Sequence, residues 1–142
     1  MAPFRLTAPE PAELDIHEAC AQALDRLLLP PAFWFTYPAG HIKLSGAEVA
    51  RLARIGLKRA LPDIWILYQR VYCVELKRHG GDLSKTRIGR TRSGAPRVFV
   101  GQEETFPLLI GTGAVAAIAV CTTVEQMLGQ VAVWNIPLRR CT

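Results

Sequence analysis

Three charged side chains stand at the ends of two neighbouring apolar segments. Asp63 follows a proline at the start of segment 63–68, and Glu75 and Lys77 end segment 71–77. Burying charge is costly, so these residues need a chemical reason. Two close carboxylates repel each other unless a cation lies between them, and their hard oxygen ligands suit Mg²⁺. A nearby ammonium can stabilise the charge that develops during attack on a phosphate, so the trio outlines a phosphodiester-hydrolysis site.

The same trio also has a simpler explanation. A Glu-x-Lys pattern on a strand is often a surface ion pair, here of Lys77 with Glu75 or with Asp63, and contributes little to function. What favours a site is the combination of a Pro-Asp pair, a hairpin, a Glu-Leu-Lys strand end and a basic segment directly downstream.

The two apolar segments are expected to form a β-hairpin. Both are rich in β-branched and aromatic residues, and only the polar pair 69–70 separates them. Because alternate side chains of a strand share a face, Glu75 and Lys77 should point one way while Leu76 points into the core. Asp63 should then face the end of the antiparallel partner strand, so that the three charges converge at one sheet edge.

The rest of the chain alternates helical and strand patterns. Ser45 and Glu48 form a capping-box pattern, and Thr122 or Thr123 is expected to cap the last helix. Pro107 indicates that the third helix is kinked there or begins no earlier than about that residue. The expected order α, β, α, β, β, α, β, α predicts an α/β domain. Its elements outside the hairpin are helices within 12–29, 46–57, 101–110 and 122–134 and strands within 32–37 and 116–121.

Positive charge is concentrated in segment 84–100. The chain has 142 residues and a net charge of +5, and five of its 17 Lys and Arg lie in this segment, which has no acid; the other 12 balance the 12 Asp and Glu. Such an excess favours an anionic partner, with nucleic acid first, although a charge run can also be a solvated loop. We expect contact with a DNA backbone, because the segment adjoins the Glu75 strand, through Lys85, Arg87, Arg90, Arg92 and Arg97.

Several classes of protein are disfavoured. Residues 1–12 form a Pro-rich arm, expected to be flexible, that lacks the apolar stretch of a secretion signal. The longest apolar run, 108–120, contains two glycines and is too short to span a bilayer, so no membrane role is expected. The four cysteines have no zinc-type spacing, and Cys73 and Cys121 lie in apolar runs where a thiol behaves as a small hydrophobe.

Taken together, the motifs resemble the virus-type replication-repair nuclease (VRR-NUC) domain of the PD-(D/E)xK nuclease superfamily. The likeness covers roughly the whole chain after the arm. It implies a restriction-endonuclease-like core, with a mixed central sheet flanked by helices, over one domain at 13–142 with a basic insertion at 84–100. The motifs that carry it are Pro62-Asp63, Glu75-Leu76-Lys77 with the Gly and Leu-Ser turn at 80–84, the loop 35–43 and the closing segment 101–139.

The resemblance also implies roles for single residues. Asp63 and Glu75 would ligate Mg²⁺ or Mn²⁺, the carbonyl group of Leu76 would add a ligand, and Lys77 would be the catalytic lysine. Lys43 lies in a loop that borders the active cleft in that family, and it would contact phosphate.

Two further site residues are assigned by the same resemblance. Glu13 best matches an additional acid on the first helix, with Glu18 as the alternative. The family's glutamine after Leu-Ser is replaced here by Arg87, so Gln102, after the basic insertion, is the expected substitute. Ala60 departs from the family's usual glycine before Pro-Asp.

The resemblance implies a metal-dependent DNA endonuclease and suits selectivity for junction or branched DNA. It further implies a homodimer in the cytoplasm of a bacterial or phage-infected cell, with no small-molecule organic cofactor. The alternative is a nuclease-fold DNA-binding module with little catalysis. The departures at Ala60 and at the glutamine position favour that alternative, and the intact Asp63, Glu75 and Lys77 argue against it.

Overall fold

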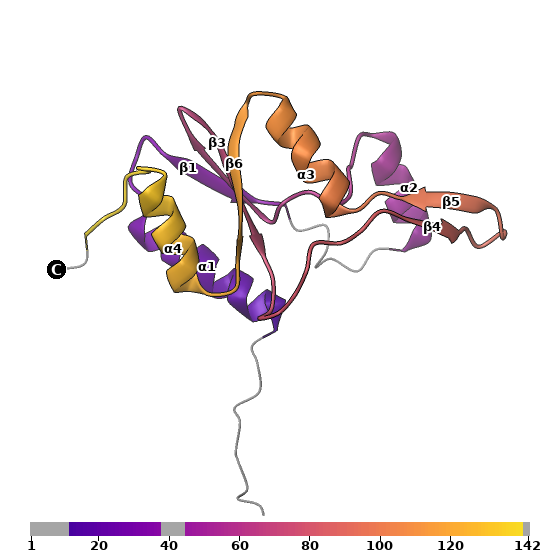
Figure 1. Ribbon diagram of the computed structural model, residues 1–142, viewed down its shortest axis with the longest axis horizontal. Helices are drawn as coiled ribbons and strands as arrows, with labels where there is room; N and C mark the ends of the chain where they lie inside the picture. Colours follow the sequence, from indigo (N-terminus) through magenta and orange to yellow (C-terminus); the bar gives the residue numbers. More distant parts are fainter. Residues whose placement is uncertain (1–11, 38–44, 141–142) are drawn as a thin grey trace, which may run out of the picture.

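A four-stranded mixed sheet forms the centre of the molecule (Figure 1). The computed structural model describes residues 12–37 and 45–140. β1, β2 and β3 are antiparallel neighbours, whereas β6 is parallel to β3, which confirms the expected α/β class with a mixed sheet. In the order in which they lie across the sheet, the strands are β1 (Phe33–Thr36), β2 (Ile64–Tyr68), β3 (Arg70–Leu76) and β6 (Val115–Cys121).

β2 and β3 form the predicted hairpin. Tyr68 pairs with Arg70, and Gln69 alone makes the turn with a φ of 59°, so Arg70 belongs to the strand rather than to the turn. At the other end Ile64 pairs with Val74. Asp63, the residue before β2, therefore lies beside the last residues of β3.

Two helices cover one face of the sheet. α1 (Glu13–Leu27) and α4 (Val124–Val133) lie side by side in Figure 1 and pack on the side chains that alternate inward along the strands. Thr123 caps α4, as expected, by accepting a hydrogen bond from the backbone of Gln126. The main core consists of residues from these helices, the sheet and the C-terminal tail: Ile16, Cys20, Ala23, Leu24, Ile64, Ile66, Val74, Leu76, Cys121, Met127, Val131 and Ile136.

The buried cysteines belong to the packed interior. Cys20, Cys73 and Cys121 are free thiols, and burial raises the pKa of Cys73 to about 12. Burial, with smaller contributions from neighbouring groups, raises the pKa of Cys20 to about 11. These thiols therefore stay protonated near neutral pH and pack as small apolar groups.

α3 (Gln102–Gly111) packs against β6 on the face of the sheet opposite α1 and α4. A start near Pro107 is wrong, because the helix begins at Gln102 and includes the proline. Pro107 cannot donate a hydrogen bond to the carbonyl group of Glu103, four residues earlier. Both residues are exposed, so water can bond that carbonyl group at little cost. No described helix is both long and apolar enough to cross a bilayer.

The basic insertion forms a second hairpin that projects from the body of the molecule (Figure 1). β4 (Arg87–Arg90) and β5 (Pro96–Phe99) are antiparallel and form a separate two-stranded sheet. No strand was predicted within this segment, which is rich in Arg, Gly, Ser and Thr. α2 (Gly46–Arg54) lies near the base of this hairpin and begins at the predicted Ser45 cap, whose side chain accepts a hydrogen bond from the backbone of Glu48.

Gly101 joins the projecting hairpin to α3. A Cβ atom at this position would overlap the carbonyl carbon of Lys85 and would lie 2.5 Å from the carbonyl oxygen of Ser84. Both neighbours are backbone atoms, which cannot turn aside as a flexible side chain would. The backbone N–H of Gly101 also donates to the hydroxyl group of Thr86. The start of α3 therefore depends on the absence of a side chain at residue 101.

The substitution Gly101→Ala should destabilise the protein. Because close-packed backbone would have to move, we expect the free energy of unfolding to fall by about 1–3 kcal/mol in urea denaturation. Gly111→Ala is the matched control, since a Cβ atom there meets nothing within 4 Å. Equal stability of the two variants would show that the close approach at Gly101 does not constrain the fold.

Candidate functional site

The structure brings Asp63, Glu75 and Lys77 together at one end of the β2–β3 hairpin. Asp63 Oδ2 accepts a hydrogen bond from the backbone N–H of Leu76 at 2.9 Å. Lys77 Nζ lies 3.1 Å from Glu75 Oε1 and forms an ion pair with it. The expected alternation is also present, because Leu76 is buried in the core and Glu75 faces the other side of the sheet.

Glu75 is a buried acid with an incompletely satisfied carboxylate. Its residue is 3% exposed, and burial, followed by the charge of Asp63, raises its pKa to about 7 despite the opposing effects of Lys77 and Gln102. Oε1 accepts from Gln102 Nε2 at 2.5 Å, whereas the buried Oε2 has no hydrogen-bond partner among the described residues. A buried polar atom in this situation costs about 1–3 kcal/mol, more when it is charged. Oε2 is therefore available to a cation.

Gln102 lies beside Glu75, at the start of α3. Its side-chain oxygen accepts from the backbone N–H of Ser84, and its own backbone N–H donates to the Ser84 hydroxyl group. These two bonds hold the buried amide so that its nitrogen can donate to Glu75. The expected substitute for the family's glutamine thus contacts a carboxylate of the site from across the insertion.

Of the two acids considered on α1, neither contacts this cluster. Glu13 is partly exposed and Glu18 is exposed, and neither side chain makes a hydrogen bond or ion pair with the other residues that the structure describes. His17, one turn after Glu13, is buried instead, and its Nε2 lies 2.7 Å from Thr36 Oγ1. Thr36 donates its hydroxyl proton to the Asp63 carbonyl oxygen at 2.8 Å.

The contacts from His17 through Thr36 to Asp63 favour one protonation of the histidine. With the Thr36 hydroxyl proton donated to Asp63, the hydroxyl oxygen is left to accept, which favours the His17 form that carries a proton on Nε2. α1 thus reaches the backbone of Asp63 through His17 and Thr36. Neither residue was assigned to the site from the sequence, where His17 served only as the polar residue that follows Glu13 in the family's first-helix pattern.

The donor set fits a hard divalent cation in part. Within 12–37 and 45–140, no three His, Cys, Asp or Glu side chains group as ligands for a metal ion. Two carboxylates remain, those of Asp63 and Glu75, close enough that the charge of one raises the pKa of the other. Mg²⁺ is commonly held by one or two carboxylates and keeps several waters. The unpartnered Glu75 Oε2 and the repulsion between the two acids both favour such an ion.

The basic residues of the insertion lie along the projecting hairpin and are exposed. The guanidinium groups of Arg87 and Arg97 lie 4.4 Å and 5.4 Å from the centre of the Phe99 ring, so both are held by cation–π contacts. Arg90 donates to the carbonyl oxygen of Gly94 at the turn. Lys85 and Arg92 complete the set of exposed basic residues. Lys43, which was expected to contact phosphate, lies outside the described residues.

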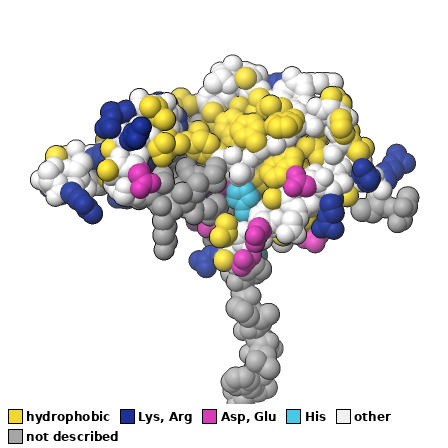
Figure 2. Space-filling view, turned by 180° about the vertical axis from the view of Figure 1, so that it is seen from behind, with side chains coloured by type: hydrophobic (Ala, Val, Ile, Leu, Met, Phe, Trp, Pro, Cys, Tyr) yellow, Lys and Arg dark blue, Asp and Glu magenta, His cyan; other side chains and the backbone are white. Residues whose placement is uncertain are grey.

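The aromatic strand β1 is only partly buried. Trp34 packs against the core, but Phe33 and Phe35 are 64% and 40% exposed on the opposite face. Phe35 stacks on Trp65 of β2. Leu67, which pairs with Phe33, is also exposed. Seen from behind in Figure 2, the molecule has a broad apolar patch over its middle, with basic side chains mainly toward its two ends.

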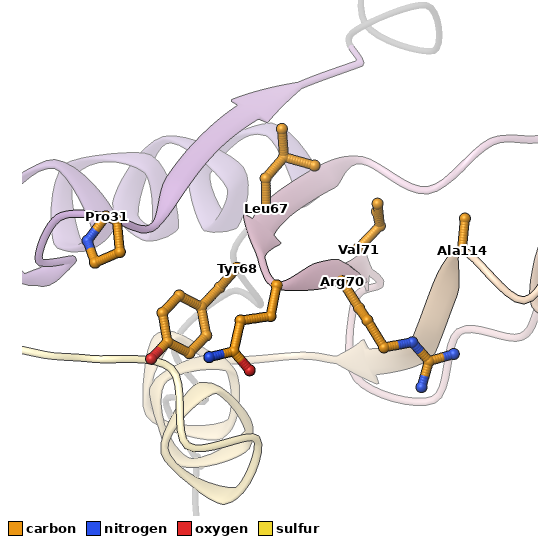
Figure 3. A pocket seen from close by; sticks show the side chains of 7 residues that line it. Pro31, Leu67, Tyr68, Arg70, Val71 and Ala114 are labelled. Carbon is orange, nitrogen blue, oxygen red and sulfur yellow. The ribbon is translucent and has the colours of Figure 1, made fainter.

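A pocket of about 510 Å³ lies away from the charged trio, at the turn of the β2–β3 hairpin (Figure 3). Figure 3 shows Tyr68 and Arg70 on either side of this turn, whereas Asp63 and Leu76 are at the other end of the same strands. No carboxylate lines the pocket. Its chemistry is therefore separate from that of the candidate metal site, which is at the opposite end of the hairpin.

Comparison with known proteins identifies no relative: no family model, no curated protein and no solved structure matches the chain. The site therefore has to be judged from its geometry. That geometry joins two carboxylates, one ammonium group and one amide within a short stretch of the sheet and the start of α3.

The elevated pKa of Glu75 predicts a pH-dependent stability. Its value of about 7 in the folded protein exceeds the ordinary 4.5, so the protonated form stabilises the fold below pH 4.5 and this stabilisation is lost as the pH rises through 7. In EDTA, the free energy of unfolding of the parent protein should fall relative to Glu75→Gln by up to about 3 kcal/mol across this window. Urea denaturation at several pH values measures the difference, and a constant difference would contradict the assignment.

Proposed function

We propose that the protein is a metal-dependent deoxyribonuclease of the PD-(D/E)xK type, in which Asp63 and Glu75 bind Mg²⁺ or Mn²⁺ and Lys77 is the catalytic lysine. One observation carries the proposal. A buried glutamate with an unpartnered oxygen lies beside a second carboxylate, with a lysine amine 3.1 Å away. A fold gains nothing from this arrangement unless a ligand compensates for the buried charge.

Each residue has a distinct task in this proposal. Asp63, held by the N–H of Leu76, and Glu75, held by Gln102, present oxygen ligands, and the Leu76 carbonyl group would add a third. A divalent cation bound there would supply Lewis-acid chemistry, polarising a phosphate oxygen and favouring the ionisation of water. Lys77, already at the site through its ion pair, would stabilise the negative charge that develops on the phosphate.

The finer fold assignment belongs to the same proposal. A mixed sheet with helices on both faces supports a restriction-endonuclease-like core and the resemblance to VRR-NUC domains. The exposed apolar side chains of Phe33, Phe35 and Leu67 support the expected homodimer, since large apolar patches often mark interfaces. A cytoplasmic location in a bacterial or phage-infected cell is part of the proposal as well.

DNA is the proposed substrate because of the hairpin of β4 and β5. Its five basic residues are exposed, project from the body and lie on the chain segment between Glu75 and Gln102. Arginine contacts with phosphates supply most sequence-independent affinity for DNA. A hairpin of this kind can follow the DNA backbone while the phosphate to be cleaved lies at the carboxylates of Asp63 and Glu75.

A DNA-binding module with little catalysis is the second candidate. The ion pair between Lys77 and Glu75 favours it, because the same pair can serve as a purely structural salt bridge. The two candidates differ in one measurable property, which is cleavage of DNA in the presence of a divalent cation.

Cleavage of supercoiled and four-way-junction DNA should require Mg²⁺ or Mn²⁺. Asp63→Asn and Glu75→Gln should each lower the rate by more than about 100-fold, since even residues that only hydrogen-bond a metal ligand matter by about 10- to 100-fold. Glu125→Gln is the control, because Glu125 is an exposed acid on α4, across the sheet from the site. Gel analysis measures the products. Cleavage that survives Glu75→Gln, or no cleavage by the parent protein, would exclude the enzyme.

The hairpin should determine how DNA binding depends on salt. Neutralising Arg90 and Arg92 with glutamine should weaken binding and reduce the slope of log Kd against log salt, by about 0.9 for each phosphate that the variant no longer neutralises. Arg139→Gln with Arg140→Gln removes the same charge near the C-terminus and should leave the slope nearly unchanged. Fluorescence anisotropy in EDTA gives both slopes, and equal slopes for the two double variants would remove the hairpin from the interface.

A further inference from the structure

Two adjoining hollows lie where α2, the projecting hairpin and α3 approach one another. The first, of about 450 Å³, is between α2 and the hairpin, and the second, of about 460 Å³, is between the segment after α2, β5 and α3. They share Leu57, Arg59 and Arg97 as lining residues. Each has a volume in the range of small-molecule sites, about 300–1,000 Å³.

The first hollow is suited to an anion. Arg59, Arg92 and Arg97 line it, and no acidic residue does. Its floor is made of small and apolar residues of α2, among them Val49 and Ala53, so nothing on the floor competes for the guanidinium groups. Three arginines that line one hollow without a carboxylate among them match the charge of a phosphate group, which guanidinium groups bind well.

The second hollow is apolar inside and basic at its rim. Side chains of β5 and α3 form much of the wall, with Phe99 and Leu108 prominent, and the segment after α2 adds Leu61. Leu108 is 66% exposed and Val98 58%, so both side chains offer apolar surface to the hollow that they line. Arg59 and Arg97 stand at the junction of the two hollows. A planar apolar group attached to a phosphate therefore fits across both.

The second hollow also adjoins the candidate metal site through the chain. Leu61 is two residues before Asp63, and Val100, which lines the same wall, is two residues before Gln102. The segments that form the wall therefore lead to Asp63, a proposed metal ligand, and to Gln102, the amide partner of Glu75. A ligand in the hollow would therefore contact segments that continue into the candidate metal site.

We propose that the two hollows bind one unpaired nucleotide of a DNA strand. The phosphate lies on Arg59, Arg92 and Arg97, and the base enters the apolar hollow beside Phe99. In a duplex the bases are stacked inside and cannot enter a pocket, whereas a single strand offers them freely. The choice of DNA rests on the proposed nuclease function, and the hollow selects DNA that has a single-stranded segment next to the cleaved phosphate.

Binding measurements in EDTA test this assignment without cleavage. The probes are a blunt duplex, the same duplex with a single-stranded thymine overhang, and the overhang duplex with abasic sites in place of its bases. The parent protein should bind the overhang duplex about tenfold more tightly than the blunt one, and removal of the bases should abolish the difference. Fluorescence anisotropy gives the three affinities.

Matched double variants separate the hollows from general charge. Arg59→Gln with Arg97→Gln should lose the overhang preference, whereas Arg51→Gln with Arg54→Gln removes equal charge from α2 outside the hollows and should keep it. Equal affinity of the parent protein for blunt and overhang DNA would overturn the proposal. So would a preference that persists without bases, or tighter binding of an RNA overhang.

The outcome is independent of the enzyme assay. An overhang preference in a protein that fails to cut DNA with Mg²⁺ or Mn²⁺ would support the nucleotide site while excluding the nuclease. Cleavage without any overhang preference would leave the nuclease intact and exclude the nucleotide site.

Discussion

The buried carboxylate of Glu75 is the constraint around which this structure is arranged. One oxygen is satisfied by Lys77 and Gln102, and the other is buried without a partner among the described residues. Burial and the charge of Asp63 both oppose ionisation, which is why the pKa of Glu75 rises to about 7. The arrangement costs stability in the isolated chain and makes chemical sense when a cation shares the two acids.

Satisfying Glu75 connects the sheet to the rest of the molecule. Gln102 can reach it because α3 begins immediately after Gly101, which packs without a side chain against the backbone of 84–86. The two bonds between Gln102 and Ser84 close the base of the projecting hairpin at the same place. The basic hairpin and the buried acid are therefore held by one set of contacts, so the hairpin has a defined position relative to the candidate site.

The opposite side of the site is held by α1. His17 and Thr36 connect that helix to the carbonyl oxygen of Asp63, while α1 and α4 cover one face of the sheet. The outer part of the other face, over β1 and β2, leaves Phe33 and Phe35 exposed. The molecule thus has a firmly packed side that supports the acids and an open side on which α3, the hairpin and the two hollows lie.

Local patterns in the amino-acid sequence were enough to predict the β2–β3 hairpin, the helix caps and the meeting of Asp63, Glu75 and Lys77, because each follows from strand alternation or local capping. The resemblance to a known domain also indicated that Gln102 belongs to the candidate site. The early start of α3, the strands within the basic insertion, the link through His17 and the two hollows lined by Arg59 became visible only in the folded molecule. These features depend on which distant segments pack together and on which carbonyl groups are exposed to water. The local pattern of apolar and polar residues gives neither.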